Sequence, residues 1–370
     1  MTILYVSTFY PSKTELFRGH YIEKQAIHLS KELNENFIVL KPVLKKNISK
    51  LKIESEIVNG NKVLKLYIPN LFGLYSIYPF FYFLQKKITK LLRDELVSLE
   101  IKLVVSNDLF YSLLLGNLIS KTSPCKHINI IHGESISDKT VQYIKNKIKE
   151  QLLLCNEIFA VSSKTKYSIQ KLLKLSQDIK VNGNGIDEEI IEKYKNFTFN
   201  KKDKLTIVSI GNLNFNKGFD ITITALANLN KDFEFLIIGD GLYKGELQKL
   251  VNNYNLTSKV KFLGNISNEK VFTILEKSHF FILPSRNEAF GIVYLEGMIT
   301  NNICVGTKGQ GCEDFISNGE NGYLVKSSEE ITRIISNYEQ ISESNLISNG
   351  HRTALKYTWD ENVKNLVKYL

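Results

Sequence analysis

The sequence is poor in cysteine and contains no long apolar run. Its four cysteines stand far apart and form no C-x-x-C pair, a pattern that fits neither a zinc knuckle nor a disulfide framework. No uninterrupted apolar stretch approaches the roughly 20 residues that are needed to span a bilayer. Residues 1–7 resemble a buried strand and lack the charged segment and cleavage site of a secretory signal. We therefore expect a cytoplasmic protein, with any membrane contact at the inner face of the cell membrane.

Several catalytic signatures are also missing. The chain has no Asp-x-Asp, the usual carboxylate bridge to a metal-bound nucleotide sugar, and we expect neither a metal nor a cofactor. It has no G-x-x-x-x-G-K-[ST] loop and no G-x-S-x-G elbow, so P-loop and serine-hydrolase chemistry have no candidate residues. With 43% hydrophobic and 23% charged residues the chain can bury a core, which excludes intrinsic disorder, and its 370 residues predict two domains.

The excess of positive charge is confined to the first half. Residues 1–195 hold 29 Lys and Arg against 19 Asp and Glu, whereas residues 196–370 hold 19 of each. This asymmetry indicates a polyanion or an anionic membrane facing the first half, unless the lysines serve solubility alone. Because the basic residues follow no nucleic-acid-binding pattern, we expect no nucleic acid partner.

An aromatic stretch followed by basic residues lies in this half. Residues 67–83 contain eight aromatic side chains, and Lys86, Lys87, Lys90 and Arg93 follow them. This composition suits the headgroup layer of an anionic membrane or a lipid-linked acceptor. The alternative is a helix pair packed in the core of the first domain, since two prolines and a glycine interrupt any long amphipathic face.

Short apolar runs alternate with amphipathic segments, which indicates βαβ units and parallel sheets. In the first half we expect a helix at 21–33 and strands at 2–7, 37–43, 103–106, 128–131 and 158–161. After a polar connector at 188–204 we expect strands at 205–210, 235–238, 260–263, 280–283 and 303–306. The sequence therefore predicts an α/β fold of two doubly wound, Rossmann-like domains facing a cleft, at 1–195 and 196–356. A terminal helix at about 357–370 is expected to pack back on the first domain.

The segment from Pro284 to Glu296 follows an apolar strand and opens a predicted helix. The free amides and partial positive charge of a helix N-terminus can bind phosphate or sugar oxygens, and Gly291 lets a ligand approach the backbone. Glu288 is expected at the mouth of this site. Glu296 is expected about two helical turns further on, where its carboxylate can accept two ribose hydroxyls. The amides concerned are those of Phe290, Gly291, Ile292 and Val293.

Two glycine-rich turns follow other strands of the second half. The first, residues 211–218, contains Lys217, whose point charge suits a phosphate oxygen. The second contains Gly239, Gly241 and Gly245 and resembles a dinucleotide fingerprint, but the next strand lacks the acidic residue that would hold a ribose. A dinucleotide-dependent oxidoreductase or epimerase, and a non-catalytic sugar-nucleotide-binding module, remain as alternatives.

Two positions of the first half lie where ligands bind in α/β proteins. His132 directly follows the strand at 128–131, at the kind of strand end that carries ligand groups, although such a histidine can equally be structural. The turn after the first strand holds Arg18 and Gly19, where a second wall of the cleft would lie.

These motifs, in this order, resemble those of the retaining glycosyltransferases of family 4, which have the GT-B fold. Glu288 and Glu296 match the E-x7-E pair of that family within a P-S-x-x-E-x-F-G setting, and residues 211–218 match its G-x-L-x-x-x-K-G loop. Residues 184–187, 309–313 and 321–325 resemble further motifs of the family. The resemblance covers nearly the whole chain and is densest in the second half.

The resemblance implies how the donor is bound. Lys217 would neutralise the diphosphate, Glu296 would hold the ribose, and the amides of residues 290–293 would bind sugar hydroxyls or phosphate. Gly19 matches the glycine turn after the first strand.

The resemblance also implies which residues are catalytic. Glu288 would face the anomeric centre and His132 would lie near the transferred sugar, so we expect Glu288, His132 and Lys217 to be catalytic.

The chain departs from the family at Asn212, where arginine is usual. We expect Asn212 and Arg286 to contact the donor, and Arg286, Lys308 and Arg18 are the candidates for the missing positive charge. The first-strand turn has Arg18 before Gly19 in place of a second glycine.

The implied reaction moves a hexose with retention from a nucleotide-diphosphate sugar, expected to be UDP-linked, to a saccharide acceptor. A lipid-diphosphate-linked acceptor in surface polysaccharide or glycolipid synthesis would agree with the basic first half. Since bond breaking develops negative charge on the diphosphate, positive groups must be preorganised around it. We expect front-face transfer in which the departing phosphate takes the acceptor proton; covalent attack by Glu288 is the alternative.

Overall fold

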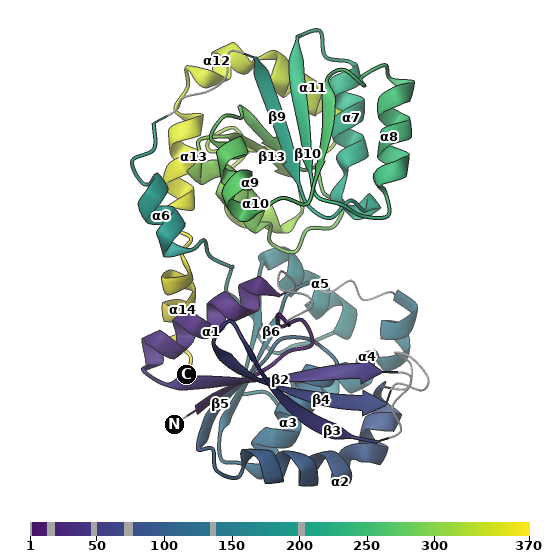
Figure 1. Cartoon of the computed structure of the whole chain (residues 1–370), viewed down its shortest axis with the longest axis vertical. Helices are drawn as coiled ribbons and strands as arrows, with labels where there is room; N and C mark the ends of the chain where they lie inside the picture. Colours follow the sequence, from purple (N-terminus) through teal and green to yellow (C-terminus); the bar gives the residue numbers. More distant parts are fainter. Residues whose placement is uncertain (1, 13–18, 46–49, 70–76, 134–137, 199–203) are drawn as a thin grey trace. The chain divides into compact units, whose positions relative to one another are not determined.

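Two compact units make up the chain. The computed structural model describes residues 2–12, 19–45, 50–69, 77–133, 138–198 and 204–370. One unit comprises Met1–Gly183 together with Trp359–Leu370, and the other comprises Asn184–Thr358. Each unit has its own largely parallel sheet flanked by helices (Figure 1).

The first unit is built on an eight-stranded sheet in the order β3-β4-β2-β1-β5-β6-β7-β8. Neighbouring strands pair in parallel, except that β3 and β4 form an antiparallel hairpin at one edge. The strands are β1 (Thr2–Val6), β2 (Asn36–Lys45), β3 (Lys52–Val58), β4 (Asn61–Pro69), β5 (Ile101–Ser106), β6 (Lys126–Ile131), β7 (Glu157–Ala160) and β8 (Lys180–Val181). The helices are α1 (His20–Leu33), α2 (Ile77–Leu96), α3 (Tyr111–Thr122), α4 (Asp138–Leu152), α5 (Ser163–Leu173) and α14 (Trp359–Val367).

The second unit is built on a six-stranded parallel sheet in the order β11-β10-β9-β12-β13-β14. The strands are β9 (Leu205–Ile210), β10 (Phe233–Ile238), β11 (Val260–Gly264), β12 (Phe280–Ile282), β13 (Ile303–Thr307) and β14 (Tyr323–Val325). The α-helices are α6 (Glu188–Tyr194), α7 (Phe219–Ala227), α8 (Lys244–Asn253), α9 (Asn268–Leu275), α10 (Ile292–Ile299), α11 (Ser328–Ser336), α12 (Tyr338–Ser342) and α13 (Leu346–Ala354). The 3₁₀ turns are η2 (Phe215–Lys217) and η3 (Gly311–Asp314).

Both sheets reverse their strand order at their first strand. β1 pairs with β2 on one side and β5 on the other, and β9 pairs with β10 and β12 in the same way. Central strands of this kind are buried on both faces, which is why β1 is apolar at nearly every position and buried throughout. The predicted fold class, two doubly wound α/β units, is confirmed.

The β3–β4 hairpin was not among the predicted strands. Asn59 and Gly60 form its two-residue turn with φ of 48° and 82°, so that Val58 pairs directly with Asn61. Both turn residues need positive φ, which Asn-Gly supplies, and this dipeptide between alternating strands is the sequence signal that predicts the hairpin.

The aromatic stretch is divided between the core and the surface. β4 ends at Pro69 and α2 begins at Ile77; residues 70–76, with Phe72 and Tyr75, lie outside the described residues. On α2, Phe81 is buried among apolar residues of the core, whereas Phe83 is 79% exposed. One face of this helix therefore packs in the core, and another face is exposed.

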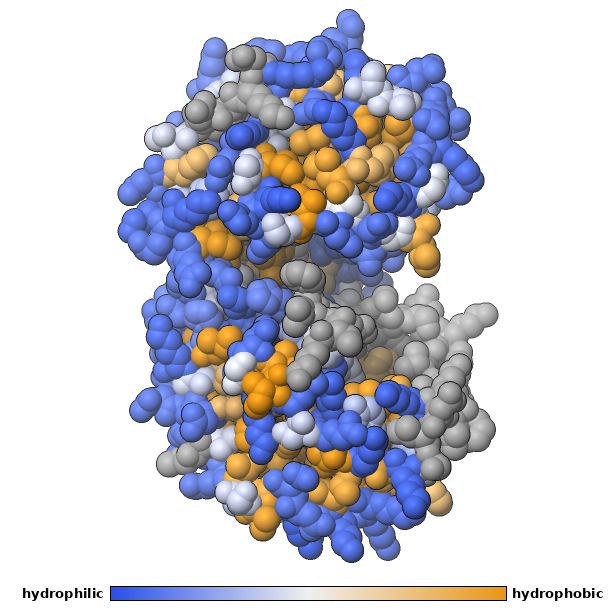
Figure 2. Space-filling model, in the orientation of Figure 1, coloured by the Kyte–Doolittle hydropathy of each residue, from blue (hydrophilic) through white to orange (hydrophobic). Residues whose placement is uncertain are grey.

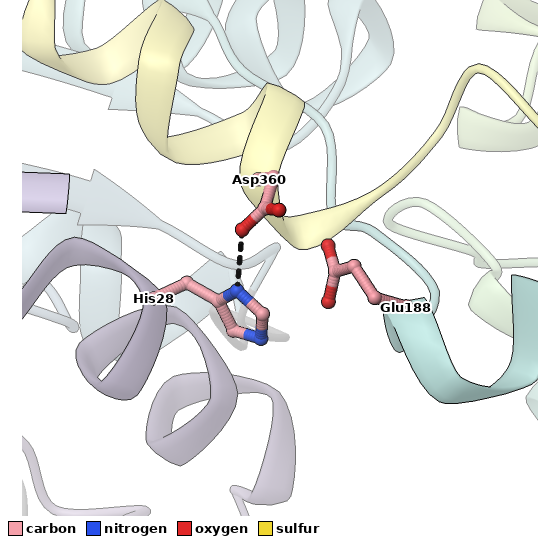
Figure 3. Close-up of side chains that lie close together, drawn as sticks. All are labelled: His28, Glu188 and Asp360. Carbon is pink, nitrogen blue, oxygen red and sulfur yellow. Dashed lines mark hydrogen bonds and ion pairs between the residues drawn. The ribbon is translucent and has the colours of Figure 1, made fainter. Parts of the chain in front are cut away.

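The last helix, α14, packs on α1 within the first unit. Gln25 of α1 donates its side-chain amide to Oδ1 of Asn362 at 3.0 Å. His28 of α1 and Asp360 of α14 share a hydrogen bond of 2.9 Å, drawn in Figure 3. Trp359, at the start of α14, is buried. The chain thus returns to its first sheet after completing the second.

Hydrophilic side chains cover most of the face seen in Figure 2, and the apolar ones gather in small patches. Of the helices whose residues are described, none combines the length and apolar character needed to cross a membrane.

We predict that Gly19→Ala destabilises the first unit more than Gly60→Ala does. Both glycines have positive φ, at 74° and 82°, so each substitution incurs the left-handed strain of about 1–2 kcal/mol. A Cβ at Gly19 would also lie 1.7 Å from the Phe9 carbonyl oxygen, whereas a Cβ at Gly60 would have no described atom within 4 Å. Denaturant unfolding should show a loss of about 3 kcal/mol or more at Gly19. Equal losses for the two variants would contradict the close approach.

Candidate functional site

Two loops meet at the carboxyl end of the second sheet, where its strand order reverses. The Lys217 loop, residues 211–218, follows β9, and the Glu288 turn, residues 284–291, follows the neighbouring strand β12. A Cβ at Gly218 would lie 2.1 Å from the Pro284 carbonyl oxygen, and the Arg286 amide donates to the Asn216 carbonyl at 2.7 Å. The two loops therefore touch backbone to backbone at the edge where open α/β sheets bind ligands.

Lys217 and Glu288 form an ion pair across these loops. The Lys217 ammonium donates to Glu288 Oε2 at 2.8 Å, with the side chains 25% and 10% exposed. The Ser285 hydroxyl donates to the same oxygen at 3.3 Å. The structure thus brings together Lys217 and Glu288, two of the three expected catalytic residues. The Lys217 ammonium and the Ser285 hydroxyl both bind the Glu288 carboxylate.

The backbone of Glu288 is fixed as well. Its amide donates to Oε1 of Gln310 at 2.9 Å, and its carbonyl accepts from the Gly311 amide at 3.1 Å. A Cβ at Gly311 would lie 2.0 Å from the Ala289 carbonyl oxygen, so the glycine-rich turn after β13 packs directly on the Glu288 turn.

Helix α10 begins directly after the Glu288 turn. Gly291 occupies its N-cap position with φ of 91° and has no side chain that could cap the helix. The first amides of such a helix are free to bind oxygens of a ligand, and its N-terminus carries a partial positive charge. Phe290 is buried against Phe315, so this residue offers a ligand its backbone only. Glu296 is half-buried on α10, in the second turn.

The residues expected to supply positive charge differ in their surroundings. Asn212 is exposed. Arg286 donates from both terminal nitrogens to the Asp220 carboxylate, at 2.8 and 2.6 Å. Lys308 is exposed just after β13, and Arg18 lies outside the described residues.

The second glycine-rich turn supports the Lys217 loop. Cβ atoms at Gly239 and Gly241 would lie 2.0 and 2.3 Å from the carbonyl oxygens of Gly211 and Leu213. The Leu213 amide donates to the Asp240 carbonyl at 2.9 Å. These glycines are needed for the approach of two backbones, which accounts for a dinucleotide-like pattern without a ribose-binding acid.

His132 and Gly19, the remaining site residues, belong to the first unit. His132 follows β6 and shares a 2.9 Å hydrogen bond with Oδ1 of Asn107. Its ring packs against that of Tyr21 at an interplanar angle of 46°, with ring centroids 4.7 Å apart. An amide oxygen only accepts, so the ring proton lies on Nε2 and Nδ1 keeps its lone pair. Burial lowers the pKa of His132 to about 3, which keeps the imidazole neutral near pH 7.

Sequence reasoning missed Asn107 and Asp108, which follow β5. Burial raises the pKa of Asp108, and its carboxylate accepts from the Thr8 hydroxyl at 2.9 Å and the Phe110 amide at 2.8 Å. The available signal was their position directly after an apolar strand.

Comparisons with known proteins show which family and which fold the chain resembles. Residues 190–356 match the family model of the glycosyl transferases group 1. The chain is 28% identical over 280 residues to an uncharacterized glycosyltransferase of Methanocaldococcus jannaschii, covering 72% of this chain and 74% of that protein. It is 28% identical over 210 residues to the N-acetyl-alpha-D-glucosaminyl L-malate synthase of Bacillus anthracis, covering 54% of each.

Two solved structures share the fold over the whole chain. Anabaena HepE in complex with UDP matches with a TM-score of 0.72 and 17% identity, covering 100% of this chain and 99% of that one. The lipopolysaccharide outer core galactosyltransferase WaaB matches with a TM-score of 0.74, 17% identity and the same coverage. The family match supports neither the oxidoreductase nor the binding-module alternative. The chain is therefore a glycosyltransferase of the GT-B fold that resembles the group 1 glycosyl transferases over residues 190–356.

Proposed function

We propose that the chain transfers a hexose from a UDP-sugar to a saccharide acceptor in surface polysaccharide or glycolipid synthesis. The observation that carries the proposal is the Lys217–Glu288 pair beside the uncapped N-terminus of α10. UDP as the nucleotide is supported by the Anabaena neighbour, which was solved with UDP. Screening a panel of nucleotide sugars by thermal shift tests this choice, because a bound donor raises the melting temperature.

In this proposal the second unit holds the leaving group. Lys217 and the first amides of α10 face the diphosphate, Asn212 contacts the donor beside them, and Glu296 accepts the ribose hydroxyls. As the bond from C1 to the phosphate oxygen breaks, these groups stabilise the growing negative charge. The acceptor oxygen bonds to C1 on the same face, and its proton passes to the departing phosphate.

Glu288 acts in this proposal as an electrostatic partner of the sugar. A carboxylate that already accepts from an ammonium and a hydroxyl is a weaker nucleophile than a free one, which favours front-face transfer over covalent attack. A neutral His132 would lie near the transferred sugar without adding charge to the site, and Gly19 shapes the first-strand turn.

The acceptor side is proposed to meet an anionic membrane through α2. Tyr82 and Phe83 are exposed on this helix, and Lys86, Lys87 and Lys90 continue the same exposed surface. Exposed aromatic rings and lysines together suit a headgroup layer, where a lipid-diphosphate-linked acceptor would be held.

We predict that Lys217→Ala lowers turnover by about 10²-fold or more, the usual effect of losing a preorganised charge. The measurement is the initial rate of UDP release with the donor chosen by the thermal-shift screen. Lys261→Ala is the matched control, because Lys261 also pairs with a glutamate but lies on β11. A Lys217→Ala rate within three-fold of the control would overturn the proposed role.

We predict that Glu296→Ala weakens UDP binding by about ten-fold or more, since hydrogen bonds to a charged group contribute about 1.5–3 kcal/mol each. Calorimetric titration with UDP measures the affinity. Glu246→Ala, which removes an exposed carboxylate from α8, should leave it unchanged. An unaltered affinity in the Glu296 variant would remove the ribose assignment.

We predict that Phe83→Ser combined with Lys86→Glu reduces sedimentation with phosphatidylglycerol vesicles at low salt by about ten-fold or more. Lys249→Glu, a charge reversal at an exposed lysine of α8, serves as the control and should have little effect. Absence of vesicle binding by the unaltered protein, with full activity on a soluble saccharide, would eliminate the membrane proposal.

A further inference from the structure

The Lys217 loop needs support from outside, because its central turn is weak by itself. Lys217 is the last residue of η2, a single 3₁₀ turn. Hydrogen bonds of 3₁₀ turns have poor geometry. In this turn the Lys217 amide donates to the Asn214 carbonyl at 3.2 Å, and the Gly218 amide donates to the Phe215 carbonyl at 3.4 Å. A long lysine side chain on such a turn would otherwise sample many positions.

Arg286 supplies contacts on both sides of Lys217. Its guanidinium binds the Asp220 carboxylate through two parallel hydrogen bonds and donates to the Phe215 carbonyl at 2.7 Å. Its central carbon lies 3.9 Å from the centroid of the Phe215 ring. Phe215 precedes Lys217 by two residues and Asp220 follows it by three, so the guanidinium bridges the turn that carries the ammonium. Bidentate and stacked contacts of this kind depend on the planar fork of arginine.

The charge of Arg286 is therefore already satisfied within the protein. Hydrogen bonding to Asp220 raises the pKa of the guanidinium, which keeps the bridge charged at any working pH. Asp220 lies in the first turn of α7, where the helix N-terminus also favours a carboxylate. Arg286 and Asp220 are 30% and 20% exposed on their side chains, so the pair is shielded from much of the solvent.

We propose that Arg286, Asp220 and Phe215 form a clamp that positions Lys217 toward Glu288 and the donor diphosphate, and that Arg286 is a positioning residue rather than a donor contact. The inference rests on the proposed role of Lys217. The clamp matters because displacement of a catalytic group by about 1 Å can cost about 10²-fold in rate. With Asn212 in place of the usual arginine, the loop has a single cation whose position must be held.

The test compares Arg286→Lys with Asp220→Asn, which remove the bidentate contact from opposite sides. If the clamp exists, both variants should lose about ten-fold or more in turnover, while calorimetry with UDP shows affinity within three-fold of the unaltered protein. The double variant should be no worse than the poorer single one, because both act through one contact. Asp220→Glu, which keeps a carboxylate, should restore part of the turnover.

A direct donor contact by Arg286 gives a different result. Asp220→Asn would then leave UDP affinity and turnover intact or improve them, since it frees the guanidinium, whereas Arg286→Lys would weaken UDP binding. That pattern overturns the clamp. Arg333→Ala, which removes an exposed arginine from α11, is the control for loss of charge.

Hydrogen exchange of residues 211–220 gives a readout that does not require turnover. The clamp predicts that exchange in this segment speeds up about ten-fold or more in Arg286→Lys and Asp220→Asn, and clearly less in Lys217→Ala. Unchanged exchange in the first two variants would contradict the clamp even if activity fell. Normal turnover of Lys217→Ala, with fast exchange in the clamp variants, would instead reject the proposed role of Lys217 and leave the clamp standing.

Discussion

The close approach of two backbones at the carboxyl ends of β9 and β12 is the constraint on which the second unit depends. Gly218 contacts the Pro284 carbonyl, and Gly311 contacts that of Ala289, so three chain segments meet without room for a side chain between them. This contact brings a lysine from one strand end within 2.8 Å of a glutamate from the next. The glycines of the motifs therefore set the geometry, and the charged residues act within it.

The sequence predicts those parts of the fold that depend on local pattern. The apolar runs of β9, β12 and β13 are buried strands, and Pro284 to Glu296 is the end of a strand followed by a helix, as its residue types indicate. The edge strand β3 of this hairpin was not predicted because it alternates between polar and apolar residues and lacks the continuous apolar run of a buried parallel strand.

The pairings within the site could not be predicted in the same way. Nothing in the local sequence around Arg286 indicates that Asp220, 66 residues earlier, takes up its guanidinium, because that contact arises only when β9 and β12 lie side by side. Gly239 and Gly241 show the converse: their spacing suggests a ligand-binding turn, whereas in the folded unit they make room for the Lys217 loop. Motif spacing thus predicts where a site lies better than which residues serve as its supports.

Charge pairing in the second unit bears on how an anionic donor is attracted. The Arg286 guanidinium is neutralised by Asp220 and the Lys217 ammonium by Glu288, in a half of the chain that holds as many acidic as basic residues. In the proposed function, attraction for a diphosphate would therefore come chiefly from the first amides of α10, which carry fixed partial charge, and from Lys217 exchanging part of its interaction with Glu288 for a phosphate oxygen. Because that exchange would happen where the sugar lies, donor binding would weaken the contact between Lys217 and Glu288 without breaking it. Glu288 would stay held by two donors, with more of its negative charge directed at the carbon on which positive charge develops. An ion pair that weakens on binding would in this way couple recognition of the diphosphate to stabilisation of the reacting sugar.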